Sequence, residues 1–133
     1  MNTSRVLIVE DDPTLRMALV DTLETAGFEV FEAVNGKEAL LQLMHHDVEA
    51  IVSDVQMDIM DGEELLTQVR NRYPSIPFLM MTAHASIERA VSAIRDGAVD
   101  YLQKPFEAAA LVSAVERMTI GSKLDSGAMI AED

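Results

Sequence analysis

Five polar side chains follow directly after short apolar runs of the sequence, and their types suit a chemical role. They are Glu10, Asp11, Asp54, Thr82 and Lys104. If the apolar runs are parallel strands, their carboxyl ends meet at one edge of a sheet and gather the five side chains there. Three carboxylates in one place repel one another by on the order of several kcal/mol unless a cation binds or one is protonated. We therefore expect a divalent cation at this edge.

The ligand types indicate which cation and which reaction to expect. Oxygen ligands, with no cysteine or histidine among them, favour Mg²⁺, which keeps several waters and also binds phosphate oxygens. A carboxylate such as Asp54 can attack a phosphoryl group when cations neutralise the transferred charge, and Lys104 supplies one such cation. The Thr82 hydroxyl can then hydrogen-bond to a phosphoryl oxygen and move toward it. The set predicts phosphoryl transfer coupled to a conformational signal.

The elements that must position these residues alternate regularly along the chain. Five short segments are predicted strands: Val6–Val9, Glu29–Ala33, Ala50–Ser53, Pro77–Thr82 and Val99–Leu102. Each is followed by residues at helical spacing, which predict helices from Pro13 to Ala26, Gly36 to about Met44, Gly62 to Tyr73, Ile87 to Ile94 and Ala108 to Met118. Strict alternation with short loops predicts right-handed crossovers and a parallel sheet with helices on both faces.

Composition limits the class of protein. A chain of 133 residues with 49% hydrophobic residues suits one folded domain, and its lack of cysteine excludes a disulfide framework. The net charge of −13 should repel nucleic acid and anionic membrane surfaces, so we expect no nucleic-acid binding by this chain alone. No apolar run approaches the roughly 20 residues of a membrane span, and the first residues lack a secretory signal. A cytoplasmic location is expected, with no membrane association.

The sequence resembles the receiver domains of two-component response regulators over Arg5 to Met118. The resemblance rests on five motifs in order, Val9-Glu10-Asp11-Asp12, Ser53-Asp54, Met60-Asp61-Gly62, Met81-Thr82-Ala83 and Lys104-Pro105-Phe106. It implies an α/β fold of the flavodoxin-like (βα)5 type, a doubly wound parallel five-stranded sheet with strand order 2-1-3-4-5. Residues 1–119 would form the receiver domain. The chain loses helical periodicity from Thr119 onward, and residues 120–133 would be a linker toward a C-terminal output domain.

The resemblance also implies roles for individual residues. Asp54 would be the phosphoacceptor, assisted by Lys104 and Thr82. Mg²⁺ would be held by Asp11, Asp54, the backbone carbonyl of Gln56 and, directly or through water, Glu10, whereas Asp12 would only cap a helix. Tyr101 would be an aromatic switch that turns inward when Thr82 moves, and Lys104–Pro105 would be a cis peptide.

Partners and output follow from the same resemblance. A sensor histidine kinase would donate the phosphoryl group, and a homodimer would form through the fourth helix, fifth strand and fifth helix, or through the fifth helix and the linker. The segments Met81–His84, Leu102–Phe106 and Met129–Asp133 look like those of enhancer-binding activators that work with sigma-54. Transcription activation is then the expected output, and a stand-alone receiver that relays phosphate or docks on a partner is the alternative.

Other interpretations explain the residues less well. Taken singly, Asp54 is a turn residue, Thr82 a strand former, Lys104 a solvated lysine and Tyr101 an aromatic at the core edge. A phosphatase with an aspartyl nucleophile would need an acid two residues after the nucleophile to protonate the leaving group. This chain has Gln56 at that position. A nucleotide-binding domain would need a glycine-rich loop after the first strand.

One pair departs from the receiver pattern. Asp58-Ile59 stands where the family usually has Pro-Gly, between Met57 and Met60. The loop loses its rigid turn residues and acquires a carboxylate near Asp54. This carboxylate would either strengthen cation binding or slow phosphoryl entry, and the sequence leaves both open.

Overall fold

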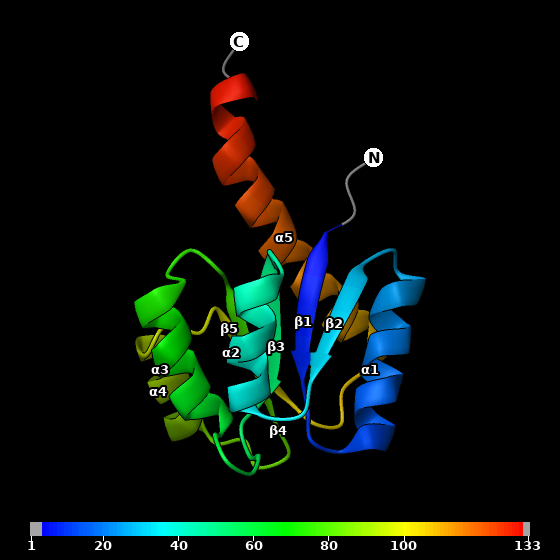
Figure 1. Cartoon of the computed structure of the whole chain (residues 1–133), viewed down its shortest axis with the longest axis vertical. Helices are drawn as coiled ribbons and strands as arrows, with labels where there is room; N and C mark the ends of the chain where they lie inside the picture. The colour runs from blue at the N-terminus through cyan, green and yellow to red at the C-terminus, as the bar shows by residue number, and fades with distance from the viewer. Residues whose placement is uncertain (1–3, 132–133) are drawn as a thin grey trace.

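The computed structural model describes residues 4–131, and the side chains of residues 4–120, as one sheet of five strands with five helices (Figure 1). The strands are β1 (Arg5–Val9), β2 (Glu29–Ala33), β3 (Ala50–Asp54), β4 (Phe78–Thr82) and β5 (Asp100–Gln103). The helices are α1 (Pro13–Thr25), α2 (Gly36–His45), α3 (Gly62–Arg72), α4 (Ile87–Arg95) and α5 (Ala108–Ala131). All neighbouring strands are parallel, in the order β2-β1-β3-β4-β5. The predicted doubly wound sheet and its strand order are confirmed.

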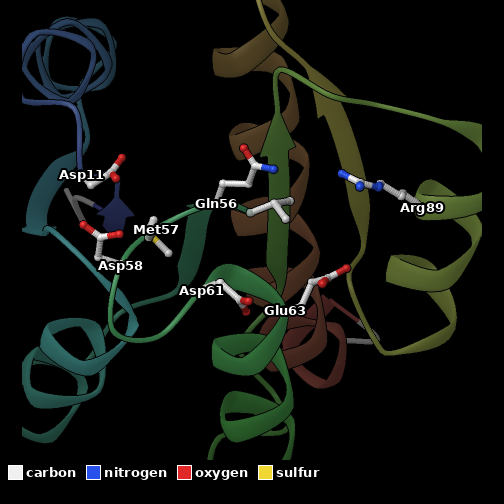
Figure 2. A pocket seen from close by; sticks show the side chains of 8 residues that line it. Asp11, Gln56, Met57, Asp58, Asp61, Glu63 and Arg89 are labelled. Atoms are coloured by element: carbon white, nitrogen blue, oxygen red, sulfur yellow. The ribbon is translucent and has the colours of Figure 1, made fainter.

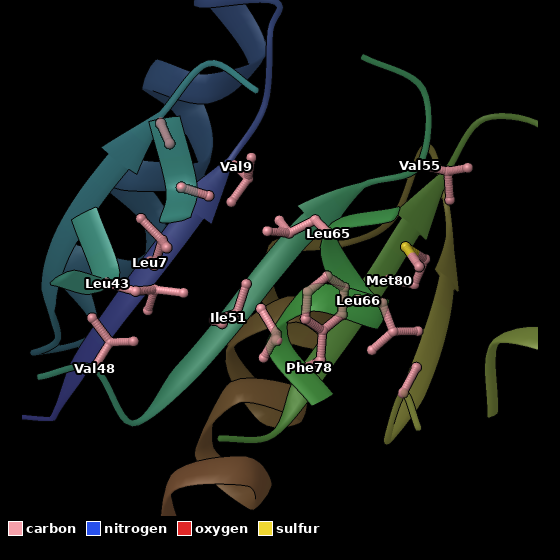
Figure 3. Close-up of a cluster of buried hydrophobic side chains, with 14 of the residues drawn as sticks. Leu7, Val9, Leu43, Val48, Ile51, Val55, Leu65, Leu66, Phe78 and Met80 are labelled. Atoms are coloured by element: carbon pink, nitrogen blue, oxygen red, sulfur yellow. The ribbon is translucent and has the colours of Figure 1, made fainter. Parts of the chain in front are cut away.

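Both faces of the sheet are buried, which explains why β1 is a continuous apolar run. Successive side chains of a strand point to opposite faces. Leu7 accordingly packs in a cluster with Leu65 and Leu66 of α3 (Figure 3). Ile8 packs in a second cluster, on the other face, with helices α1 and α5. The two clusters pack against both faces of the central strands, and this packing positions the residues at their carboxyl ends.

The helix starts follow the polar residues that the sequence places there. The Asp12 side chain accepts hydrogen bonds from the backbone N–H groups of Thr14 and Leu15, so its predicted role as a helix cap is confirmed. Asn35 caps α2 by accepting from the Glu38 N–H. The Glu38 carboxylate, however, accepts from the N–H of Val34, one residue before the partner expected in a capping box.

The apolar stripe of α4 faces away from the core. Its large residues Ile87, Val91 and Ile94 are 84%, 50% and 49% exposed, and Ala93 is the buried residue of this helix. Their spacing is that of one helical face. Periodicity predicted the helix correctly, but no element within the described part of the chain, residues 4–120, covers this face.

Helix α5 is longer than expected. The sequence predicted loss of helix from Thr119 onward, but α5 continues to Ala131 and its end extends beyond the sheet (Figure 1). That expectation was wrong. Gly121 and Gly127 each destabilise the helix by only about 1 kcal/mol, and a helix that packing has already nucleated continues easily when no proline interrupts it. A linker role for residues 120–133 stays a prediction. Within residues 4–131, no helix is both long and apolar enough to cross a membrane, α5 included.

Candidate functional site

Three carboxylates meet at the carboxyl edge of the sheet, as the sequence predicted. Glu10 and Asp11 follow β1, Asp54 ends β3, and these strands are neighbours with Val9 opposite Ser53. Each of the three side chains offers an oxygen, and these oxygens lie within 4.8 Å of one another. Glu10 is 1% and Asp54 8% exposed, whereas Asp11 is open to solvent. This cluster can bind a metal ion from the solvent side.

The ammonium of Lys104 lies between the two buried carboxylates. Its Nζ is 2.8 Å from Glu10 Oε1 and 3.3 Å from Asp54 Oδ2. The remaining oxygens accept backbone hydrogen bonds, Glu10 Oε2 from the Asp12 N–H and Asp54 Oδ1 from the Val55 N–H. Lys104 follows β5, and the Lys104–Pro105 bond is cis, as expected. Each buried carboxylate therefore has one oxygen on the lysine and one on the backbone.

Burial and pairing shift two titrating groups in this cluster. Burial raises the pKa of the Glu10 carboxyl above its ordinary value, although its hydrogen bonds with Lys104 and the Asp12 N–H oppose this rise. Burial alone would lower the pKa of the Lys104 ammonium, but the Glu10 hydrogen bond and the negative charges of Asp54 and Glu10 raise it. Lys104 is therefore a permanent cation at neutral pH.

An open pocket of about 570 Å³ lies beside the carboxylates (Figure 2). It is lined by Asp11, Val55, Gln56, Met57, Asp58, Asp61, Glu63 and Arg89. Gln56, a predicted ligand, therefore shares the pocket with Asp11. Glu63 and Arg89 also line this pocket, although the sequence motifs did not indicate them. Arg89 lies on α4, 35 positions after Asp54, so no local pattern could have indicated it.

Thr82 and Tyr101 lie on the neighbouring strands β4 and β5. Thr82 is 1% exposed, and its hydroxyl oxygen accepts a hydrogen bond of 3.0 Å from the His84 N–H. Tyr101 pairs with Met80 across the sheet and packs against the cluster that contains Leu65. Its hydroxyl is buried and has no hydrogen-bond partner among residues 4–120, whose side chains are described. The aromatic side chain is thus already turned inward in this structure.

The loop between β3 and α3 contains a strained turn at the unusual Asp58-Ile59 pair. Ile59 has φ of +72°, and the Met60 N–H donates to the Asp58 carbonyl at 2.7 Å. This is a γ-turn, which is rare with positive φ and unfavourable for a β-branched residue. The loop lacks the usual Pro-Gly pair but still forms a tight turn. Isoleucine occupies a backbone conformation in this turn that glycine adopts freely.

The same loop brings helix α3 against the phosphoacceptor candidate. The Gly62 N–H donates to the Val55 carbonyl at 2.8 Å. A Cβ atom at Gly62 would collide with the backbone carbonyl oxygen of Asp54. Only glycine therefore allows the start of α3 to approach this closely.

Comparisons with known proteins agree with this geometry. Residues 6–116 match the response regulator receiver domain family. The chain is 50% identical to the response regulator protein FleR of Pseudomonas aeruginosa over 119 residues, which are 89% of this chain and 25% of FleR. It is 40% identical to the DNA-binding transcriptional regulator NtrC of Salmonella typhimurium over 117 residues, again 25% of that protein.

A solved structure has the same architecture. The CheY-like receiver domain protein of Methanospirillum hungatei matches with a TM-score of 0.88 and 27% identity, covering 93% of this chain and 99% of that one. The chain thus spans about a quarter of FleR and NtrC but nearly the whole of a receiver domain. With the family match, the sheet order and the acidic site in agreement, the chain belongs to the response regulator receiver domain family.

Proposed function

We propose that this chain accepts a phosphoryl group on Asp54 from a sensor histidine kinase, with Mg²⁺ as cofactor, and thereby switches a transcriptional output. The observation that carries the proposal is the cluster of Glu10, Asp11 and Asp54 with Lys104 bound to two of them. Family membership supports the same reading, because receiver domains are signalling modules and this cluster lies at the expected edge of the sheet.

The donor set fits Mg²⁺. It consists of carboxylate oxygens, with Asp11 exposed and water able to reach the cluster from the pocket. Asp11 and Asp54 would bind directly, Glu10 directly or through water, and Gln56 through its backbone carbonyl. Bound Mg²⁺ supplies positive charge to the phosphoryl oxygens.

In the proposed reaction, a carboxylate oxygen of Asp54 attacks the phosphorus atom of the kinase phosphohistidine. The new O–P bond forms as the N–P bond breaks, and the electron pair leaves on the imidazole nitrogen. Lys104 is 3.3 Å from Asp54 Oδ2, from where its ammonium can move onto a phosphoryl oxygen. This movement would exchange one anionic partner of Lys104 for another and needs no change in its charge.

The signal would begin at Thr82. Its hydroxyl now accepts from the His84 N–H and would rotate to donate to a phosphoryl oxygen. Tyr101 would respond as the switch residue, since its hydroxyl is buried without a partner and gains from any rearrangement that provides one. The two residues would couple the phosphoryl group to the surface of β5 and α4.

The output surface is the exposed apolar face of α4 with its neighbours. Ile87, Val91 and Ile94 form a stripe on α4, and Val99 beside β5 is 52% exposed. Apolar side chains gathered on one face favour association, and we assign this face to a homodimer or to contact with an output domain. The name of NtrC, a DNA-binding transcriptional regulator, supports a transcriptional output. We propose sigma-54-dependent activation as the form of this output.

Intact-mass spectrometry tests the phosphoryl transfer. The parent chain, Asp54→Asn and the matched control Asp47→Asn are each incubated with Mg²⁺ and acetyl phosphate. Asp47 is an exposed acid that precedes the amino end of β3, opposite the end that carries Asp54. The expected result is one adduct of about 80 Da, the mass of HPO₃, in the parent and control but not in Asp54→Asn or in EDTA. An adduct that persists in Asp54→Asn would contradict the assignment of the phosphoacceptor.

Light scattering tests the output surface. The beryllofluoride-treated parent chain is expected to form a dimer by this measurement, because a stripe of exposed apolar side chains is then paired. Val91→Asp should prevent this dimer, since a charge in the stripe would be buried without a partner. A dimer that survives Val91→Asp would exclude this face as the dimer contact.

A further inference from the structure

The loop after β3 carries a carboxylate that the proposed reaction does not use. We propose that Asp58 is a determinant of cation affinity, whose carboxylate holds water of the outer shell of the ion bound at Glu10, Asp11 and Asp54. This inference rests on the proposed function, since it concerns the same ion. The sequence left two consequences of the Asp58 charge open, stronger cation binding and slower phosphoryl entry, and we infer the first.

Asp58 shares a pocket with a direct ligand. It lines the 570 Å³ pocket together with Asp11 and Gln56. In Figure 2, Asp58 and Asp11 lie at one end of the pocket, whereas Glu63 and Arg89 lie toward the other. The added carboxylate is therefore on the side of the cation cluster, away from the guanidinium that would neutralise it.

The Asp58 carboxylate lies too far out for direct coordination with all three acids. The oxygens that lie within 4.8 Å of one another belong to Glu10, Asp11 and Asp54, and Asp58 does not join them. The pocket has room for several waters, each of which occupies about 30 Å³. Because Mg²⁺ keeps several of its waters in proteins, an outer carboxylate can bind these waters without displacing them.

The turn holds Asp58 in place. The Asp58 carbonyl accepts from the Met60 N–H, and the Met60 carbonyl accepts from the Gly36 N–H at 3.0 Å. At the end of the loop, Gly62 is tied to Val55 by a backbone hydrogen bond of 2.8 Å. Ile59 keeps its positive φ although its side chain is 78% exposed, so backbone contacts rather than side-chain packing maintain the turn.

The charge of Asp58 is available to the ion. Within residues 4–120, where side chains are described, the ion pairs do not include Asp58. Asp61, by contrast, uses one oxygen to cap α3 through the Glu64 N–H. An outer-shell carboxylate about 4–5 Å from a divalent ion strengthens binding roughly five-fold at physiological salt, after screening by water and ions.

Isothermal titration calorimetry with MgCl₂ tests the inference, and no phosphodonor is needed. Asp58→Asn removes the charge at nearly constant shape, Asp58→Glu retains it, and Asp47→Asn changes net charge equally at the opposite edge of the sheet. We expect roughly five-fold weaker Mg²⁺ binding for Asp58→Asn, less than about two-fold change for the other two variants, and a difference that shrinks at high salt.

The outcomes separate this inference from the proposed function. If Asp58→Asn binds Mg²⁺ as tightly as the parent, or if Asp47→Asn weakens binding equally, the inference is overturned and the cation site stands. If the parent itself binds no Mg²⁺, both fail. The increase in melting temperature caused by Mg²⁺ gives a second readout on the same variants, in which a smaller increase for Asp58→Asn alone supports the inference.

Discussion

Replacement of Lys104 by methionine should destabilise the chain in a manner that depends on pH and is reversed by Mg²⁺. Methionine retains most of the aliphatic length but removes the ammonium that binds Glu10 at 2.8 Å and Asp54 at 3.3 Å. Because the Glu10 side chain is 1% exposed, water cannot replace the missing cation. The variant must either keep an unpaired buried carboxylate or protonate it.

Protonation limits the size of the effect. Neutralising a carboxyl with the ordinary pKa of 4.5 costs about 3.5 kcal/mol at pH 7 and about 0.7 kcal/mol at pH 5. Loss of one partner from a buried ion pair typically costs about 3–5 kcal/mol. We therefore expect Lys104→Met to lose about 2–4 kcal/mol of unfolding free energy at pH 7 and less than about 1 kcal/mol at pH 5.

The direction follows from the pKa of Glu10. Burial raises this pKa in the folded state, so the proton on Glu10 favours the folded state below pH 4.5, and that contribution is lost as pH rises through the higher folded-state value. Lys104 offsets this loss in the parent. Its own pKa is also raised, so its contribution is present throughout the neutral range and is lost only as pH rises above 10.5.

Urea denaturation followed by far-ultraviolet circular dichroism measures this effect between pH 5 and pH 8 in EDTA. Lys37→Met is the matched control, because Lys37 is exposed at the start of α2 and the substitution changes net charge equally. The control should stay within about 0.5 kcal/mol of the parent. Excess Mg²⁺ should restore Lys104→Met by about 2.7 kcal/mol when its concentration is 100 times the dissociation constant.

Two results would refute this reasoning. Equal stability of Lys104→Met and the parent at pH 7 in EDTA would mean that the carboxylates do not need the lysine. A deficit that is the same at pH 5 and pH 8 would mean that lost packing, not unpaired charge, is responsible.

Three further predictions concern particular features of the fold. Ile59→Gly should raise the unfolding free energy by about 0.5 kcal/mol in urea denaturation, because relief of the positive φ exceeds the loss of a mostly exposed side chain. The control Val99→Gly should lower the unfolding free energy. A lower unfolding free energy for Ile59→Gly would contradict the inference that Ile59 is strained. Gly62→Ala should cost about 2–3 kcal/mol in the same assay, since its Cβ meets the Asp54 carbonyl, and a neutral result would show that α3 can shift freely. Tyr101→Phe should retain or raise the melting temperature, because it removes a buried hydroxyl without a partner, and a drop of more than a few degrees would indicate a hydrogen bond that the structure lacks.

The sequence predicted the fold well because its local patterns and its tertiary structure agree. The continuous apolar run of β1 is buried on both faces, and α1 begins at the Asp12 cap that the sequence indicated. Short loops restrict such elements to parallel pairing with helical crossovers. The acidic site followed from the same logic, because residues that end neighbouring parallel strands share an edge.

The errors in prediction have physical causes. Helix α5 passes the point where periodicity is lost, because propagation of a helix needs no amphipathic pattern once packing has nucleated it. The spacing of Ile87 and Val91 predicted a helix. Periodicity cannot, however, distinguish an apolar helix face that packs on the core from one that is exposed at the surface. The γ-turn at Ile59 went unpredicted because a β-branched residue argues against positive φ.

By itself, then, the sequence determined the strand and helix order, the family and the identity of the residues at the acidic edge, because these depend on short-range patterns and on the constraints of parallel sheets. Only the tertiary structure decided that Lys104 bridges Glu10 and Asp54, that Asp58 and Arg89 line one pocket, and that the Tyr101 hydroxyl is buried. These contacts join residues that are distant in the chain, and their distances depend on how the helices and loops pack on the sheet.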